Sequence, residues 1–399
     1  MVQLLPALHA GGVERSTLEI AGALVRKGHR AIVVSAGGRL VQPLLDAGGE
    51  HLSLDIGRKS LLTLRHMPTL RRLFAEVGAD IVHARSRLPA WLGYKALQSM
   101  PAATRPAWVT TVHGLNSPGR YSAIMTSGQQ VICVSNTVAA YVRRHYPQVP
   151  EQRLRVIPRG VDLAAFARRA RPDRAARRAL VQAHPGLAGD GPLLLLPGRG
   201  TRLKGHAQAL ELLAGLHAAG HGNARLWMPG LVETGREAYL AELMALAQRL
   251  QVADAVVASA ATGQIAQAYA GADLVLQLSS KPEAFGRTVV EALAVGCPVL
   301  GWDHGGVGEL LATLQPSGAV PPGDMPALLA RAQALLASPP QAPSHIPYTL
   351  AAMQQGTLDI YEQLIDVIDN GHRLDRTRDH QSAVVLAPGE GLGLKRGEI

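Results

Sequence analysis

The sequence has few of the residues that build disulfide frameworks or metal clusters. Only two of its 399 residues are cysteines, and both Cys133 and Cys297 lie in apolar, strand-like runs. We expect two buried free thiols, which excludes a disulfide-stapled scaffold or a cysteine-rich metal site and fits a reducing compartment. No Asp-x-Asp pair occurs, so no carboxylate pair is evident that would hold Mg²⁺ or Mn²⁺ against a diphosphate. We therefore expect no metal and no cofactor.

Long apolar runs are also missing. No run approaches the roughly 20 residues that span a bilayer, and the segment from Met1 lacks the regions of a signal peptide. We expect a cytoplasmic protein, at most peripheral at a membrane. Two glycine-rich segments resemble nucleotide-binding motifs but do not match them. Gly389–Gly393 lacks the third glycine of a dinucleotide fingerprint. Gly198–Gly205 lacks the residues that flank the Walker A lysine.

Charge is unevenly distributed along the chain. The formal net charge is +10. Residues 1–160 hold 20 Lys and Arg against 8 Asp and Glu, a net of +12, whereas residues 161–399 hold 20 against 22, a net of −2. A basic half attracts anionic partners such as phosphorylated glycolipid, acidic bilayer or nucleic acid. Aromatic residues make up only 4%, and no nucleic-acid-reading motif appears. The basic run Arg168–Arg174 is interpreted as a solvated linker and the start of a helix.

Apolar runs alternate with amphipathic helical patterns in two series, which predicts two doubly wound α/β domains with parallel sheets. The first series has strands near residues 2–5, 31–35, 81–84, 108–112, 131–134 and 154–157, and the second near 193–196, 224–228, 255–257, 274–278 and 298–301. We place the first domain at residues 1–165 and the second at 166–345. A helix near 350–369 follows, and residues 372–399 are expected to be a disordered tail.

An anion site is predicted where two strands of the second domain end. Arg199 and Lys204 follow one strand, at the edge of a parallel sheet where ligands bind. Arginine grips phosphate oxygens as a fork, and lysine adds a point charge. After another strand, Gly286–Thr288 opens a helix whose free N–H groups suit phosphate. Glu283 and Glu291 flank this helix start and could hold sugar hydroxyls.

These segments resemble family 4 of the GT-B glycosyltransferases from about Val2 to Ile368. The resemblance is carried by the pair of glutamates eight positions apart, by the Gly198–Gly205 loop, by Gly305-Gly-Val-Gly-Glu309, read as a loop, and by four short motifs: Gly11-Gly-Val-Glu-Arg15, His113-Gly114, Val134-Ser135 and Ile157-Pro-Arg-Gly-Val-Asp162. It is nearest to bacterial transferases of lipopolysaccharide and other surface glycans. It implies two Rossmann-like domains facing a cleft, with the last helix crossing back onto the first domain.

The resemblance also implies a retaining, metal-independent hexosyl transfer from a nucleotide-diphosphate sugar to a glycan or glycolipid. It assigns the diphosphate to Arg199 and Lys204, sugar hydroxyls to Glu283 and the ribose to Glu291. His113 would contact the donor sugar near the reacting carbon. Phosphate contacts complete the site: Gly12, Gly286, Arg287 and Thr288. Arg202 is left open as a further phosphate contact or a solvated residue.

The basic first domain suggests binding to an anionic inner membrane face. The candidate cations for membrane or acceptor binding are Arg58, Lys59, Arg65, Arg71, Arg72, Arg85 and Arg87. Three of them lie on the predicted helix Thr63–Val77, which suits an interfacial helix and equally a core-packed helix with a basic outer face. Two alternatives remain: another GT-B enzyme, such as a sugar phosphorylase or nucleotide-sugar epimerase, and a basic nucleic-acid-binding protein.

Overall fold

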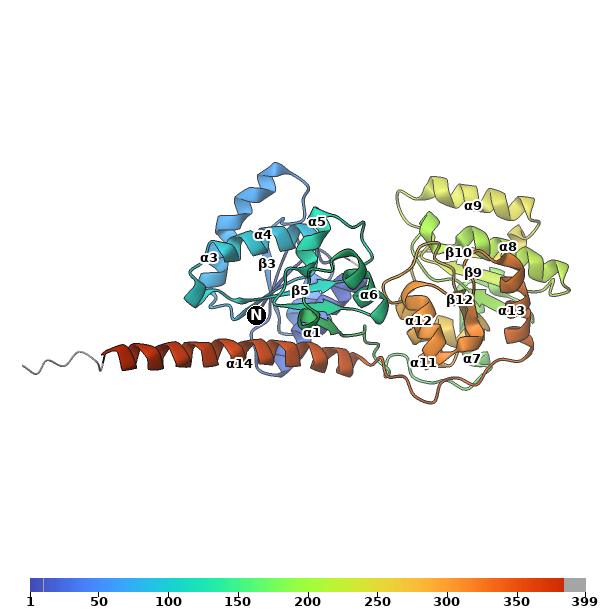
Figure 1. Cartoon of the computed structure of the whole chain (residues 1–399). Coiled ribbons are helices and arrows are strands. Elements are labelled where there is room, and N and C mark those ends of the chain that lie inside the picture. Colours follow the sequence, from blue (N-terminus) through green and yellow to red (C-terminus); the bar gives the residue numbers. More distant parts are fainter. Residues whose placement is uncertain (10, 384–399) are drawn as a thin grey trace, which may run out of the picture.

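The computed structural model describes residues 1–9 and 11–383 and contains two sheets, each in its own α/β domain (Figure 1). The first domain is built on a seven-stranded sheet in the order β3-β2-β1-β4-β5-β6-β7, with every neighbouring pair parallel. Its strands are β1 (Val2–Leu4), β2 (Ile32–Ser35), β3 (Glu50–Ser53), β4 (Ile81–Ala84), β5 (Ala107–Val112), β6 (Gln130–Cys133) and β7 (Leu154–Val156). The two-domain α/β prediction is confirmed.

Helices connect these strands and cover the sheet. They are α1 (Gly12–Arg26), α2 (Val41–Asp46), α3 (His66–Glu76), α4 (Arg87–Gln98), α5 (Arg120–Ala123) and α6 (Asn136–His145), with 3₁₀ turns η1 (Leu61–Arg65), η2 (Ala102–Thr104), η3 (Ile124–Thr126) and η4 (Glu151–Arg153). The strands β1, β2, β4 and β5 are buried along their whole length, as apolar parallel strands covered on both faces must be.

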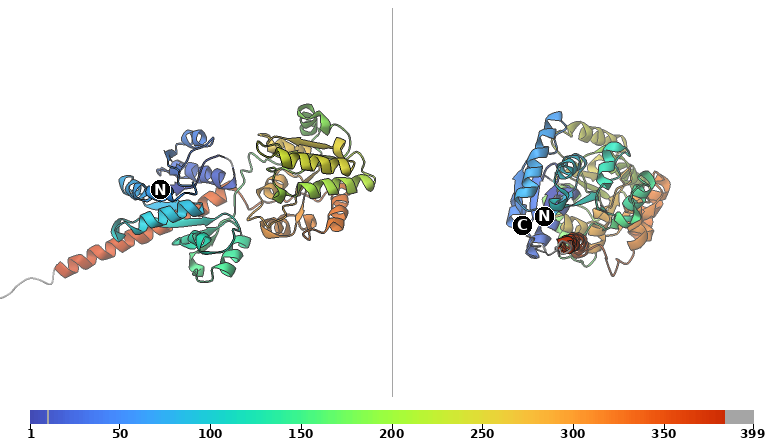
Figure 2. Two further views of the ribbon diagram at one scale, coloured as in Figure 1. Left: turned by 90° about the horizontal axis from the view of Figure 1, so that it is seen from above. Right: turned by 60° about the vertical axis from the view of Figure 1, so that its left-hand side comes forward.

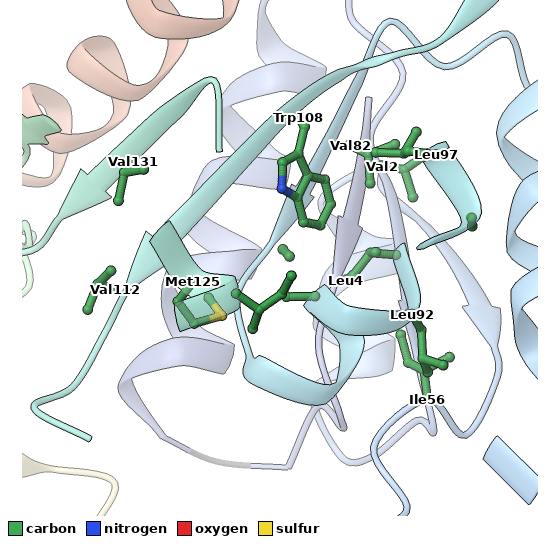
Figure 3. Close-up of a cluster of buried hydrophobic side chains, with 14 of the residues drawn as sticks. Val2, Leu4, Ile56, Val82, Leu92, Leu97, Trp108, Val112, Met125 and Val131 are labelled. Carbon is green, nitrogen blue, oxygen red and sulfur yellow. The ribbon is translucent and has the colours of Figure 1, made fainter. Parts of the chain in front are cut away.

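The core on one face of the first sheet is packed around Trp108. Figure 3 shows its indole among side chains of β1, β4 and α4, including Leu4, Val82 and Leu97. Packing there is tight: a Cβ at Gly93 of α4 would lie 2.5 Å from Leu4 Cδ1. The opposite face is closed by α1 and by the last helix of the chain. Because both faces of the sheet are tightly packed, the positions of the strand ends are fixed. The loops that follow these strand ends, and carry the site, are therefore held in place.

The second domain has a six-stranded parallel sheet in the order β10-β9-β8-β11-β12-β13. Its strands are β8 (Leu193–Leu195), β9 (Arg225–Pro229), β10 (Val256–Ser259), β11 (Leu274–Gln277), β12 (Val299–Trp302) and β13 (Ala319–Val320). Its helices are α7 (Arg174–Ala183), α8 (His206–Ala218), α9 (Glu237–Arg249), α10 (Ile265–Gly271), α11 (Arg287–Val295), α12 (Gly305–Leu314) and α13 (Met325–Ala337), with 3₁₀ turns η5 (Pro185–Leu187), η6 (Arg202–Lys204), η7 (Ala253–Ala255) and η8 (Pro316–Gly318).

The chain crosses between the domains twice, and the two crossings run side by side. Val161 N donates to Tyr348 O at 2.9 Å, and Leu350 N donates to Val161 O at 2.9 Å. Gly160 permits this approach, because a Cβ there would lie 2.5 Å from Leu350 Cα. The paired crossings form a compact connection between the domains.

After the second crossing, α14 (Leu350–Ala383) returns along the first domain and extends beyond it (Figure 2). Buried side chains of its first half pack beside α1, and Tyr361 OH lies 2.6 Å from His83 Nδ1 on β4. We expected the helix to end near residue 369 and disorder to begin at 372. The helix instead continues to Ala383, and no proline, the residue that ends a helix most strongly, occurs between residues 369 and 387. The remainder of the predicted tail lies outside the described residues.

Three local expectations are corrected by the structure. Gly305–Glu309, read as a loop, forms the start of α12. The single helix expected over Thr63–Val77 is divided into η1 and α3. The run Arg168–Arg174 is not simply solvated.

Arginines of this segment satisfy carbonyl groups that helices leave open at their carboxyl ends. Arg171 donates to Tyr269 O at 3.2 Å and to Ala272 O, at the end of α10, and Arg168 donates to Ala294 O of α11 at 3.1 Å. The basic run therefore ties the interdomain segment to the second domain.

Candidate functional site

The carboxyl ends of β8 and β11 place Lys204 against Glu283. Lys204 ends the 3₁₀ turn η6, and Lys204 Nζ lies 2.6 Å from Glu283 Oε1. Gly205 makes this turn possible: its φ is +78°, and a Cβ there would lie 2.1 Å from Leu278 O at the end of β11. Two predicted site residues separated by 79 positions are thus in direct contact.

The carboxylate of Glu283 is held by further donors from the end of β11. Ser279 Oγ donates to Glu283 Oε1 at 2.5 Å, and Gln277 Nε2 donates to Oε2 at 3.3 Å. Sequence reasoning missed both residues, since a serine and a glutamine after a strand carry no specific signal. Together they hold the carboxylate in place independently of Lys204.

The two arginines of the preceding loop behave differently. Arg199 is exposed, and its side chain forms no hydrogen bond or ion pair with the residues that the structure describes. Arg202 is engaged: its guanidinium forms a two-pronged pair with Glu242 of α9 at 2.5 Å and lies 5.2 Å from the centre of the Tyr239 ring. Arg202 therefore fastens the loop to α9, and Arg199 is the cation left to face a ligand.

The helix α11 begins at the predicted phosphate position. Its N-cap is Gly286, with a φ of +106° and no side-chain cap, so the first amides, at Arg287 and Thr288, have no partner within the helix. Across the domain boundary, α1 begins at Gly12, also without a side-chain cap. A Cβ at Gly12 would meet nothing within 4 Å, which leaves the backbone there open to approach. Both helix starts suit anions.

Charged side chains of α1 and α11 pair across the domain boundary. Arg287 Nη2 lies 3.1 Å from Glu19 Oε1, and Arg15 Nη1 lies 3.8 Å from Glu291 Oε1. Glu291 also accepts from the buried Tyr269 hydroxyl at 3.0 Å, and burial raises the pKa of that hydroxyl well above its usual value. The predicted ribose ligand is thus a held carboxylate that faces the other domain.

A second interdomain contact was missed by sequence reasoning. The carboxylate of Glu309 on α12 caps the amino end of α6 in the other domain. It accepts from Thr137 N at 2.8 Å, Thr137 Oγ1 at 2.9 Å and Asn136 N at 3.1 Å. Nearby, Ser135 Oγ donates to Ala284 O at 2.5 Å. Asn136 Nδ2 also donates to Glu309 at 2.9 Å, so five hydrogen bonds link the domains here, and Ala284 directly follows Glu283.

His113 stands at the end of β5, on the first domain. It is half-buried, and its Nδ1 lies 2.5 Å from Nη2 of the buried Arg159. Its Nε2 is covered from solvent and has no hydrogen-bond partner among the described residues. Burial lowers the pKa of His113 well below 6.5, and the positive charges of Arg159 and Arg85 lower it further. His113 is thus neutral at neutral pH.

The seven cations proposed for a membrane or acceptor surface do not form one set. Arg85 is buried, and its Nε donates to Gln3 Oε1 at 2.6 Å. Arg87 is half-buried and donates to Ser122 Oγ at 3.2 Å. The prediction of a surface role is wrong for Arg85, which is buried and donates to Gln3 on β1 and to Ser16 on α1. For Arg87 the surface role stays a prediction.

The other five cations are exposed on one protruding segment of the first domain, and three exposed leucines lie among them. The cations are Arg58, Lys59, Arg65, Arg71 and Arg72. Leu61 is 86% exposed and Leu62 68%, with Leu64 also exposed, which is unusual for side chains that gain free energy by leaving water. No group of three or more potential metal ligands occurs in residues 1–9 and 11–383. Across the same residues, no helix is long and apolar enough to cross a membrane.

Comparison with known proteins fits this two-domain arrangement. The family model described as Glycosyltransferase Family 4 matches residues 10–165, and the one described as Glycosyl transferases group 1 matches residues 179–349. Two facing Rossmann-like domains with a returning last helix define the GT-B class of glycosyltransferases. The chain belongs to family 4, group 1, of these enzymes, which confirms the resemblance drawn from its motifs.

Several relatives support the assignment. The D-inositol 3-phosphate glycosyltransferase of Xylanimonas cellulosilytica is 28% identical over 333 residues, which is 75% of this chain and 76% of that protein. A glycosyltransferase structure from Rickettsia africae has a TM-score of 0.78 at 25% identity, covering 91% of this chain and 98% of that one. Anabaena HepE, in complex with UDP and glucose, shares the fold with a TM-score of 0.71 at 20% identity, covering 95% and 99%.

Proposed function

We propose that the protein transfers a hexose from a nucleotide-diphosphate sugar to a glycan or glycolipid, with retention of configuration and without a metal ion. The observation that carries the proposal is the convergence of Lys204, Glu283 and the open start of α11 at one edge of the second sheet. A cation and free amides suit a diphosphate, and a held carboxylate suits sugar hydroxyls.

The chemical task of this site is to stabilise charge on the leaving diphosphate. Negative charge grows there as the bond to the anomeric carbon breaks, and preorganised cations and amides stabilise it without reorganisation. Arg199 and Lys204 supply the cations, and Arg287 and Thr288 supply amides. The acceptor hydroxyl attacks from the face that the diphosphate leaves, and a diphosphate oxygen takes its proton. No protein nucleophile is required.

A panel of nucleotide sugars tests the proposal. Each is screened for thermal stabilisation of the protein and for release of nucleoside diphosphate, with UDP-glucose included because HepE has been crystallised with UDP and glucose. At least one should stabilise the protein and be turned over. Retention is tested by NMR, because the new glycosidic bond should have the donor's anomeric configuration. An inverted product would refute the proposed stereochemistry.

The acceptor is expected to be anionic, within lipopolysaccharide or another bacterial surface glycan. The net charge of +12 in residues 1–160 supports this, as does the name of the Xylanimonas relative, which includes a phosphate. No observation favours a phosphorylase, an epimerase or a nucleic-acid-binding protein over a glycosyltransferase.

We also propose that the exposed segment around Leu61 and Leu62 binds an anionic membrane surface peripherally. Leucines insert among the acyl chains, while each neighbouring cation contributes about 1 kcal/mol near an acidic surface. Sedimentation with anionic vesicles should therefore show binding that weakens with salt.

A charge-reversal pair provides a matched comparison for this surface. Arg65→Glu with Arg71→Glu should weaken vesicle binding, since neither cation has an acidic partner among the described residues. The control is the same reversal at two exposed arginines of the second domain, Arg249 and Arg331, which should have little effect. Equal loss in both double variants would mean that only overall charge matters.

A further inference from the structure

The contact between Arg159 and His113 determines which ring nitrogen of the histidine carries a proton. Arg159 Nη2 lies 2.5 Å from His113 Nδ1, and a guanidinium has donors but no acceptor. Nδ1 must therefore be unprotonated and accept this hydrogen bond. The single proton of the neutral ring is then on Nε2. An imidazolium is disfavoured, because a proton on Nδ1 would point at the guanidinium.

The partner of that proton is missing from the protein. His113 Nε2 is buried and has no hydrogen-bond partner among the described residues. A buried N–H without a partner is unfavourable unless a bound group supplies an acceptor. A sugar hydroxyl oxygen is such an acceptor, and the resemblance carried by His113-Gly114 implies that the donor sugar lies beside His113.

We propose that Arg159 is a positioning residue that fixes His113 in the neutral, Nε2-protonated form, so that the histidine donates a hydrogen bond to an oxygen of the bound sugar. The inference rests on the proposed function for the identity of that sugar, but not for the tautomer. It assigns His113 the role of a donor and excludes it as a general base acting through Nδ1.

The surroundings of the pair favour the same protonation state. Besides burial and Arg159, two further neighbours lower the pKa of His113, namely Arg85 and His83 on β4. Burial lowers the pKa of Arg159, and the charges of Arg85 and of Arg287 on α11 lower it further. The carboxylates of Glu19 and Glu14 on α1 act in the opposite direction. The net positive surroundings and burial both disfavour a charged imidazole.

Arg159 is poorly placed to bind the sugar itself. It is only 6% exposed, and it borders a cavity of about 10 Å³ whose lining also includes His83, Arg85 and Thr111. A cavity of that size has room for about one water molecule and not for a sugar ring. Arg159 therefore acts through His113.

Nitrogen NMR on the full protein labelled with ¹⁵N-histidine tests the tautomer directly. The signals of His113 are assigned by their loss in His113→Asn. We expect an unprotonated Nδ1 and a protonated Nε2 in the unmodified protein, unchanged from pH 8 to pH 5.5. The reverse tautomer, or an imidazolium at pH 7, would overturn the proposal.

Two substitutions at Arg159 sharpen the test. Arg159→Met removes the donor at similar length, so His113 should titrate nearer the ordinary value of about 6.5 and lose its fixed tautomer. Arg159→Gln keeps an N–H donor and should preserve the tautomer while losing the positive charge. An unchanged His113 spectrum in the folded Arg159→Met protein would show that Arg159 does not set the tautomer.

Turnover of the donor found in the nucleotide-sugar panel separates this inference from the proposed function. Arg159→Met should lower the rate about tenfold at pH 8 and further at pH 6, and Arg159→Gln should recover most of the loss at pH 8. In a His113→Asn background, Arg159→Met should have no additional effect. If His113→Asn leaves turnover unchanged, the role of His113 in transfer fails and the proposal with it, even where the tautomer is as expected.

Discussion

Replacing Lys204 with alanine removes the cation closest to Glu283, and the structure allows the consequences for stability and turnover to be separated. The side chains of Lys204 and Glu283 are 30% and 22% exposed, so solvent screens their attraction, and the loss of unfolding free energy should stay below about 1 kcal/mol. Glu283 also keeps its hydrogen bonds from Ser279 and Gln277. The site should therefore remain folded around the missing charge.

The loss in turnover should be much larger. In the proposed mechanism the Lys204 ammonium contacts a diphosphate whose charge grows as it departs, and removing one such preorganised contact should cost about 3 kcal/mol of transition-state stabilisation, or roughly a hundredfold in rate. The assay measures release of nucleoside diphosphate together with the melting temperature. Lys281→Ala is the control, because Lys281 is an exposed lysine of the Glu283 loop. Turnover of Lys204→Ala within a few-fold of Lys281→Ala would refute the assignment.

Three further predictions concern the same region. Arg199→Lys should slow turnover at least several-fold in the same assay, because a fork is replaced by a point charge. Turnover should survive excess EDTA, and recovery only on adding Mn²⁺ or Mg²⁺ would contradict metal independence. Glu309→Ala should destabilise the protein by about 1 kcal/mol, because the Asn136 and Thr137 amides lose their acceptor while the Ser135 cap of α6 remains, and should increase the radius of gyration in X-ray scattering as the domains separate. Glu211→Ala, an exposed change on α8, is the control and should alter neither.

Much of the fold follows from the sequence because buried parallel strands are continuous apolar runs. The segments at Ile81–Ala84 and Leu274–Gln277 are of this kind and were predicted. The edge strand β3 lacks the pattern: its sequence is Glu-His-Leu-Ser and it is only half-buried, so it was missed. The start of α12 was read as a loop because three of its first four residues are glycine.

The candidate site could be predicted only where chemistry is carried by a local motif. Lys204 and Glu283 each follow a strand, and the parallel sheet brings strand ends together. The contacts of Glu309 with Thr137 and of Arg159 with His113 join residues 172 and 46 positions apart, and no periodicity or spacing marks them. Arg85 shows the opposite error: residue type alone suggested the surface, whereas its side chain lies in the core and donates to Gln3 and Ser16, both distant in sequence.

The most direct test of the diphosphate site compares three ligands by isothermal titration calorimetry in EDTA: a nucleoside, its monophosphate and its diphosphate. Uridine, UMP and UDP serve first, followed by the guanosine and adenosine series. If Lys204, Arg199 and the start of α11 hold a diphosphate, one diphosphate should bind at least about a hundredfold more tightly than its nucleoside. Lys204→Ala should remove most of that difference. Equal affinity for nucleoside and diphosphate in all three series would contradict a nucleotide-sugar site at this position.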